Sequence, residues 1–495
     1  MELNKSIFYL FIAQLIFIIT GYIIHIFLGR YLGPEDYGIY GVIISLMTMI
    51  SLLLTTGIPT AVSKFISENI QDSENIKNKA FKLQLLISLF ISVIYYLSAG
   101  SIAFLLNDAL LINYIKTSTL IFPIYGVFYI YLNYFNGLQE FKKQSILLSI
   151  YSFSKLVLII FLVLMFEIYG AIIGFIIAPL IALLFVLLIK KIEIPIKKTE
   201  VNINNDDIFK RILNFAFPII IFSFLLNFLI NIDLLFVKAY LSDQKTGLYT
   251  VSSILSKFIY LLSIFVPNFL FPILSNTMTL KNLEKTRNLI MESIRFAFIF
   301  LIPIIFYVSL RAKDLILIFY GQKYFYAWES FTILTISIGM IILFLIFSTI
   351  INASGDPKKP MFIIALGLII SLFLNYFLVP IYELNGAAFS TFISGAIILL
   401  ISTIYIKRRF NLRMRFKSFI NIILSIILSS LILIPSIFID NEYYTILEGI
   451  IFFLVYFSLL IFIFKELTRK DLILILGSHF LNKTKFISKL FEEDF

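Results

Sequence analysis

The sequence predicts an all-α, polytopic membrane protein with fourteen transmembrane helices: two parallel six-helix bundles plus two extra C-terminal helices. Of the 495 residues, 60% are hydrophobic and 14% are charged, and the mean hydropathy is +1.00. A soluble domain has about 25% charged residues. The apolar residues come in blocks of about 20, the length of a bilayer-spanning helix. A short pattern also recurs at equivalent places in the two halves of the chain.

The apolar blocks define the expected helices in chain order. The expected spans cover residues 7–28, 39–59, 83–106, 117–136, 145–166, 169–189, 212–237, 248–274, 293–310, 328–351, 361–380, 386–405, 418–438 and 444–464. The first block is too long for the apolar region of a cleaved signal peptide. We therefore expect it to be the first spanning helix.

The internal repeat divides these spans into two halves. Tyr31–Val42 and Tyr240–Val251, 209 residues apart, share Tyr, Leu, Gly, Tyr and Val at five of twelve positions. Two further similarities occur at an offset of 216: Asn136–Lys143 resembles Asn352–Lys359, and Gly170-Ala171 corresponds to Gly386-Ala387. Six spans per half give both halves the same orientation, which is the arrangement of a parallel repeat in transporters.

The domain boundaries follow from the repeat and from the polar segments. We expect an N-terminal half at 1–190, a cytoplasmic linker at 191–211 and a C-terminal half at 212–406. Helices 13 and 14 then lie within 407–464 and have no partner in the repeat. The remaining residues, 465–495, mix apolar and basic side chains, which predicts a cytoplasmic amphipathic tail on the membrane surface.

The placement of Lys and Arg predicts the orientation. Of the 40 basic residues, 31 fall in segments on the same side as the N-terminus, seven fall on the other side and two lie inside spans. Basic loops stay on the cytoplasmic side, so both termini are expected to be cytoplasmic in a cell membrane. The net charge of +11 then reflects these loops and does not indicate a nucleic-acid partner.

The motifs of common enzymes are missing from the sequence. There is no phosphate-binding Gly-x-x-x-x-Gly-Lys-Ser/Thr, no His-Glu-x-x-His and no cysteine, and only two histidines occur. We therefore expect a protein that is not an enzyme, with no catalytic residue, no metal site and no cofactor.

Two lysines inside spans are the strongest candidates for a binding site. Lys155 and Lys257 lie near the middle of spans five and eight. A lysine at this depth is costly and needs a partner or a wet cavity. Thr250, Ser253 and Tyr260 share the helix face of Lys257, which favours a cationic cavity for an anionic group. The alternative is a pair of structural lysines inside the bundle.

Other polar residues inside the spans are candidates for lining a cavity or for ion coupling. In span seven, Asn227 and Asn231 precede Asp233, whose carboxylate is expected either to pair with Lys238 or Lys257 or to bind H⁺ or Na⁺. In span one, Gln14 and His25 are about three helical turns apart and thus share a face. This face is expected to line water, and the alternative for His25 is a packed, hydrogen-bonded side chain.

Two motifs carry a family resemblance. They are Gly29-Arg30-Tyr31-Leu32-Gly33-Pro34-Glu35-Asp36-Tyr37-Gly38 and Gly57-Ile58-Pro59-Thr60-Ala61-Val62-Ser63-Lys64. With the layout of spans, they resemble the polysaccharide biosynthesis (Wzx-type) flippases. These belong to the MOP superfamily, together with lipid II flippases and MATE multidrug exporters.

The resemblance implies a function and a site. It implies that the protein flips isoprenoid-(pyro)phosphate-linked oligosaccharide to the outer leaflet by alternating access, through a cavity lined by spans one, two, seven and eight. Arg30, Lys64, Lys155 and Lys257 would contact the lipid phosphate, although Lys155 lies outside those four spans. Membrane lipids and the glycosyltransferases or polymerase of the same pathway would be partners. With no ATP site, direction would come from consumption of the product or from an H⁺ or Na⁺ gradient.

Two other functions remain open. A MATE-like ion-coupled multidrug exporter would need acidic cavity residues, and Asp233 is the one candidate. A membrane glycan ligase or polymerase would need an acid or His on an outer loop, where Glu383, Asp440 and Glu442 are available.

Overall fold

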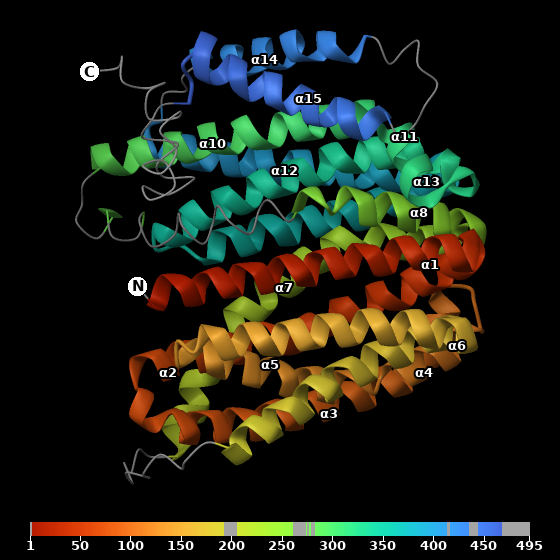
Figure 1. Ribbon diagram of the computed structural model, residues 1–495, viewed down its shortest axis with the longest axis vertical. Helices are drawn as coiled ribbons and strands as arrows, with labels where there is room; N and C mark the ends of the chain where they lie inside the picture. Colours follow the sequence, from red (N-terminus) through yellow and green to blue (C-terminus); the bar gives the residue numbers. More distant parts are fainter. Residues whose placement is uncertain are drawn as a thin grey trace.

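The computed structural model describes residues 2–192, 205–260, 283–412, 416–434 and 444–467, together with Leu274, Thr277 and Met278. These residues form helices and contain no strand. Nine helical segments in the described ranges are long and apolar enough to cross a membrane. The helices pack side by side (Figure 1). Following the charge prediction, we call the end near the N-terminus the inner end and the opposite end the outer end.

The helix bounds agree with most expected spans. In chain order the elements are α1 (Glu2–Thr55), α2 (Gly57–Glu68), η1 (Ile70–Asp72), α3 (Ser73–Leu105), α4 (Leu111–Ser118), α5 (Ile121–Gly137), α6 (Phe141–Ile192), α7 (Asn205–Tyr240), α8 (Asp243–Ser256), α10 (Leu283–Leu310), α11 (Ala312–Tyr320), η3 (Gln322–Ala327), α12 (Trp328–Ala353), α13 (Lys358–Phe410), α14 (Phe416–Ser430), η4 (Leu431–Leu433), α15 (Tyr444–Ser458) and the π-helical η6 (Leu459–Ile463). α11 and η3, at the outer end, lie in a segment expected to be a loop.

Three of the long helices are hairpins of two arms, and each holds two expected spans. α1 turns at Gly33, α6 turns at Glu167 and α13 turns at Glu383. Glu167 has φ 49° and ψ −127°, and Glu383, 216 residues later, has φ 51° and ψ −126°. The two halves therefore repeat the same turn geometry at the offset that the sequence pattern indicates.

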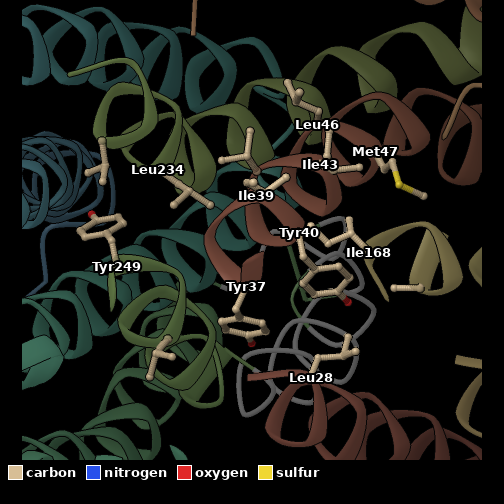
Figure 2. Packing of buried hydrophobic residues seen from close by; sticks show 14 of the residues in the cluster. Leu28, Tyr37, Ile39, Tyr40, Ile43, Leu46, Met47, Ile168, Leu234 and Tyr249 are labelled. Carbon is tan, nitrogen blue, oxygen red and sulfur yellow. The ribbon is translucent and has the colours of Figure 1, made fainter. Parts of the chain in front are cut away.

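The buried core is shared extensively at the outer end and much less at the inner end. The outer cluster unites residues of both halves, including Leu28, Tyr37 and Tyr40 with Leu234 and Tyr249 (Figure 2). At the inner end, one cluster is built from the first half together with two residues of α7, and another comes from the second half alone. The halves are thus joined most extensively at the outer end.

The C-terminal helices α14 and α15 lie beyond α10, at one end of the long axis of the molecule (Figure 1). The Tyr456 hydroxyl donates to the Ile299 carbonyl at 3.0 Å. The Arg311 guanidinium pairs with the buried Glu448 carboxylate at 2.7 Å. These contacts attach α15 to the second half through α10 and through Arg311, the residue that follows α10.

Several expected features lie wholly or mainly outside the described residues. They are most of the linker at 191–211, the end of span eight after Tyr260, the end of span thirteen, the tail after Leu467, and the loop with Asp440 and Glu442. These features stay predictions.

Candidate functional site

A central cavity of about 520 Å³ lies between the two halves. Its wall comes from both arms of α1, from α7, and from α8 with the turn that follows, which correspond to the expected spans one, two, seven and eight. Most of its polar groups are hydroxyls and amides. These polar residues are Ser45, Thr48, Thr56, Ser223, Asn227, Asn231, Thr250 and Ser253. The hydroxyls and amides of such a wall can replace water around a polar group inside the membrane.

Lys257 is the one Lys or Arg in this cavity wall, among the described residues. α8 ends at Ser256 and Lys257 is its C-cap, so the ammonium lies where the helix dipole favours a positive charge. Its Nζ donates to Asn231 Oδ1 at 2.8 Å. Thr250, Ser253 and Tyr260 also line the cavity, as the shared helix face predicts. The described part of the wall holds no Asp or Glu; the carboxylate that interacts with Lys257 is that of Asp233, which is buried behind the wall.

Asn227 and Asn231 extend the polar wall along α7. The Asn231 amide donates to the Asn227 backbone carbonyl at 2.8 Å and to Asn227 Oδ1 at 3.0 Å. These bonds orient Asn231 so that its own oxygen faces Lys257. The two asparagines thus hold the ammonium in position.

Lys155 lies outside the cavity wall, inside the first half. Its Nζ is 4.7 Å from the centre of the Phe17 ring, 5.3 Å from that of Tyr151 and 5.6 Å from that of Phe175. Aromatic faces stabilise a cation in this way without neutralising it. No ion pair of Lys155 is found among the described residues. Both Lys155 and Lys257 interact electrostatically with His25, so the two lysines flank the same region.

Arg30 and Lys64 also lie outside the cavity. Arg30 is exposed at the outer end, where its guanidinium donates to the carbonyls of Phe319 at 2.8 Å and Ile318 at 2.5 Å, at the C-terminal end of α11. Lys64 is at the inner end, 3.8 Å from Glu68 and 4.2 Å from the ring centre of Phe215. Each side chain contacts the opposite half of the protein.

Asp233 is buried beside the cavity and does not form its wall. One oxygen accepts hydrogen bonds from the Tyr249 hydroxyl at 2.7 Å and the Thr391 hydroxyl at 2.9 Å, and the other accepts the Leu234 N–H at 2.8 Å. The expected pairing with Lys238 is wrong, because Lys238 instead binds Asp108 at 2.6 Å and also Asp243. Asp233 interacts with Lys257 through space. Ion binding at Asp233 stays a prediction.

His25 and Gln14 do not share the same environment. His25 lines the cavity, and its Nδ1 is 3.4 Å from the Tyr37 hydroxyl. Gln14 is exposed on the first arm of α1, before Gly33, and is not among the residues of the cavity wall. Of the two, the described cavity wall includes His25 and not Gln14; that either side chain faces water stays a prediction.

The outer end of the cavity is closed by contacts that the sequence does not reveal. The Tyr37 hydroxyl is 3.3 Å from the Tyr320 hydroxyl, and Tyr324 donates to the Gly29 carbonyl at 2.7 Å. Figure 2 shows Tyr37 and Tyr40 within this packed region. Tyr37 belongs to the repeated motif, but no pattern in the sequence marks Tyr320 or Tyr324 as its partners.

The two repeated turns contact each other through equivalent glycines. Gly38 and Gly247 occupy matching positions of the repeat, 209 residues apart. A Cβ on Gly38 would overlap the Asp243 carbonyl, and a Cβ on Gly247 would overlap the Pro34 carbonyl. Only glycine allows this approach of the backbones. The turns therefore form the outer closure between the halves.

Comparison with protein families yields two matches. The model of the family described as polysaccharide biosynthesis protein matches residues 3–278, and the MatE model matches residues 218–377. An uncharacterized membrane protein of Methanocaldococcus jannaschii is 24% identical over 427 residues, which cover 82% of this chain and 99% of that protein.

Solved structures share the fold at low sequence identity. The lipid II flippase MurJ in an inward closed conformation has a TM-score of 0.76 at 18% identity, with 92% of this chain and 99% of that chain covered. An inward-facing MATE multidrug resistance transporter has a TM-score of 0.67 at 13% identity, covering 82% and 98%. A MOP superfamily transporter from Pyrococcus furiosus Vc1, described as having a binding pocket of reverse polarity, scores 0.61 at 15% identity, covering 83% and 96%.

Proposed function

Because the chain belongs to the polysaccharide biosynthesis protein family, we propose that it flips isoprenoid-(pyro)phosphate-linked oligosaccharide across the membrane by alternating access. The protein is a multi-pass membrane protein with the fold of MOP superfamily transporters. The observation that carries the proposal is Lys257, the one Lys or Arg in the described wall of a cavity between the halves, where no carboxylate shares the wall with it.

The charge of the cavity wall favours an anionic head group. A phosphate can pair with the Lys257 ammonium in a charge-assisted hydrogen bond, while the hydroxyl and amide groups around it can bind sugar hydroxyls. A cationic substrate would meet a like charge and no carboxylate in the described wall. This polarity supports a lipid phosphate as the ligand.

The cavity lowers the main barrier to flipping. A phosphate and its sugars cannot cross hydrocarbon without a large loss of hydration. A polar route between α1, α7 and α8 supplies replacement contacts for the head group, while the isoprenoid chain stays in lipid. An inside-negative potential contributes about 2.3 kcal/mol per charge per 100 mV in favour of outward movement of an anion.

The closed outer end suits one step of an alternating-access cycle. With the halves joined at the outer end, the cavity takes its substrate from the inner side. Release then requires separation of the Gly38 and Gly247 turns and of the Tyr37–Tyr320 contact. The halves share little buried core at the inner end, where two residues of α7 join the cluster of the first half, so closing further there while opening at the outer end completes the exchange.

The finer topology is part of this proposal. Fourteen spans, both termini in the cytoplasm and a location in the plasma membrane are supported by the basic residues on the N-terminal side and by the three two-arm helices. Glycosyltransferases or a polymerase of the pathway would supply the substrate and consume the product.

A MATE-like exporter is the second candidate, and the MatE match to residues 218–377 favours it. Asp233 would then be the cation-coupling group, for H⁺ or Na⁺. Its carboxylate is satisfied by three neutral donors and does not face the cavity, so the geometry supports ion coupling at Asp233 more than drug binding there.

A glycan ligase or polymerase has less support in the described residues. Glu383, one of the acids considered for such chemistry, forms the turn of α13 and pairs with Lys245 at 2.5 Å. The relatives with described activities are a flippase and multidrug transporters.

Reconstitution tests the proposed function. Purified protein is placed in phosphatidylcholine vesicles with a fluorescent polyprenyl-pyrophosphate oligosaccharide, and flipping is read from the fraction accessible to an external quencher. We expect the wild type to accelerate exchange between leaflets. Lys257→Ala should slow it about tenfold or more, since a hydrogen bond to a charged group is worth about 1.5–3 kcal/mol.

The matched control is Lys313→Ala, which removes a lysine that lies over Trp328 away from the cavity. It should leave the rate unchanged, and Lys257→Arg should retain most of it. The flippase proposal fails if wild-type protein does not accelerate exchange. The role of Lys257 fails if Lys257→Ala and Lys313→Ala behave alike.

A further inference from the structure

A second cavity opens on the side of the first half, between the first arm of α1, before Gly33, and the first arm of α6, before Glu167. It is a groove of about 600 Å³. Tyr9, Ile12 and Ala13 form one wall, and Ile146, Ile150 and Phe153 lie on the other. The exposed side chains of Tyr9 and Phe153 show that the groove lies on the lateral surface of the helix bundle and not in its interior. In a membrane protein such a surface faces lipid chains.

As far as the described residues show, the inner end of the groove carries one lysine. Lys142 lines the groove at the start of α6, and no ion pair of Lys142 is found within the described ranges. Lys143, its neighbour, pairs with Glu140 at 3.0 Å. Ser145 and Ser149 follow along the same wall, one helical turn apart. The groove therefore combines a cationic head region with a mostly apolar channel.

The outer end of the groove leads toward Lys155. Phe17 lies one turn beyond Ala13 on α1, and its ring stacks on Tyr151 of α6 with 6.1 Å between centroids. Lys155 lies over both rings, and its charge acts on His25 in the central cavity wall. The contact between α1 and α6 thus has Lys142 at its inner end and Lys155 between the groove and the central cavity.

We propose that the groove between α1 and α6 holds the phosphate-bearing lipid substrate in the inner leaflet before it enters the cavity, with its phosphate on Lys142 and its chain along the groove. This rests on the proposed function and adds an entry site to it. Charge complementarity selects the occupant: an anionic phosphate pairs with Lys142, and an apolar chain fits the wall beyond it. Phe17 and Tyr151 then form the barrier between this site and Lys155.

Tryptophan quenching by brominated lipid tests the site. The chain has one tryptophan, so Phe153→Trp in a Trp328→Phe background places a single reporter in the groove. The full-length protein is reconstituted in phosphatidylcholine vesicles that contain a minor fraction of dibrominated phosphatidic acid, or of dibrominated phosphatidylcholine with the same chains. We expect preferential quenching by the phosphatidic acid, and unbrominated polyprenyl phosphate should compete with it.

Two adjacent lysines provide the matched comparison. Lys142→Ala should lower the relative affinity for phosphatidic acid about fivefold, the effect of one lysine near an anionic lipid. Lys143→Ala should leave it nearly unchanged because that lysine is already paired. As a control, a single tryptophan reporter is placed by Phe90→Trp at an exposed position on α3. Its quenching should show no preference for phosphatidic acid that depends on Lys142.

The outcomes separate this proposal from the flippase itself. Equal quenching by the two lipids, equal effects of the two lysine variants, or no competition by polyprenyl phosphate overturns the groove site. Weak quenching by both lipids would show that protein covers the groove, which also overturns it. Any of these results can coexist with normal flipping, and a lipid preference without flipping would leave the groove site standing while the flippase proposal fails.

Discussion

At the scale of single residues, the membrane-buried charges have distinct environments. Lys257 meets amide oxygen in a cavity, Lys155 meets aromatic faces, and Asp233 meets neutral hydrogen-bond donors. Of these three charges, Lys257 is the one that lines a cavity described in the structure. A buried charge alone therefore does not identify a ligand site, because rings and hydroxyls inside a bundle can also stabilise it.

Tyr249→Phe should destabilise the protein by about 1–3 kcal/mol, because it removes a donor to the buried Asp233 carboxylate. Thermal unfolding in detergent measures the change. The effect should shrink in an Asp233→Asn background, where no charge needs the hydroxyl. Tyr240→Phe, at an exposed tyrosine, is the control. Equal losses in both backgrounds would contradict the assignment.

At the scale of elements, the turns within α6 and α13 are the best evidence of the repeat. Glu167 and Glu383 have the same backbone angles within 2°, although the residues directly before and after them differ. Positive φ with negative ψ in this range is the conformation of a type II′ turn, which favours glycine. Both halves therefore hold a glutamate in an unfavourable backbone conformation at the same place.

Glu167→Gly should stabilise the protein by about 1 kcal/mol, because glycine adopts this conformation without strain. The shift in the midpoint of thermal unfolding is the measurement. Glu383→Gly should gain less, since it also loses the ion pair with Lys245. A lower midpoint for Glu167→Gly would show that the carboxylate itself stabilises the turn.

At the scale of the whole molecule, the halves meet at a closed outer end. The shared outer core, the Tyr37–Tyr320 contact and the Lys238–Asp108 ion pair all join the halves there. Arg30 adds its hydrogen bonds to α11. A residue expected to bind substrate thus contributes to closure, because the outer turn that carries it packs on the opposite half.

Gly247→Leu should prevent this closure, since a side chain at Gly247 would overlap Pro34. The chain has no cysteine, so a single Ser253→Cys in the cavity reports access. A membrane-impermeant maleimide added outside intact cells should label it faster in the Gly247→Leu variant. Gly100→Leu, where nothing lies within 4 Å of the added Cβ, should leave the rate unchanged, and equal labelling of both variants would contradict the proposed gate.

The sequence alone determined the all-α membrane class, the repeat and the candidacy of Lys257, while the spans that surround the cavity were implied by the family resemblance. Hydropathy blocks and helix faces are local properties, and a polar stripe on one helix predicts the side that meets water. The same reasoning placed Thr250, Ser253 and Tyr260 beside Lys257.

Only the tertiary structure decided which charges share a space. It put Lys155 among aromatic rings, Arg30 on α11, Lys238 between two aspartates and Lys142 at the mouth of a groove. The physical reason is that a charge is satisfied by partners hundreds of residues away, as Arg30 is by Phe319. The helix face of a residue is set by its near neighbours, but its partners are set by how the two halves pack.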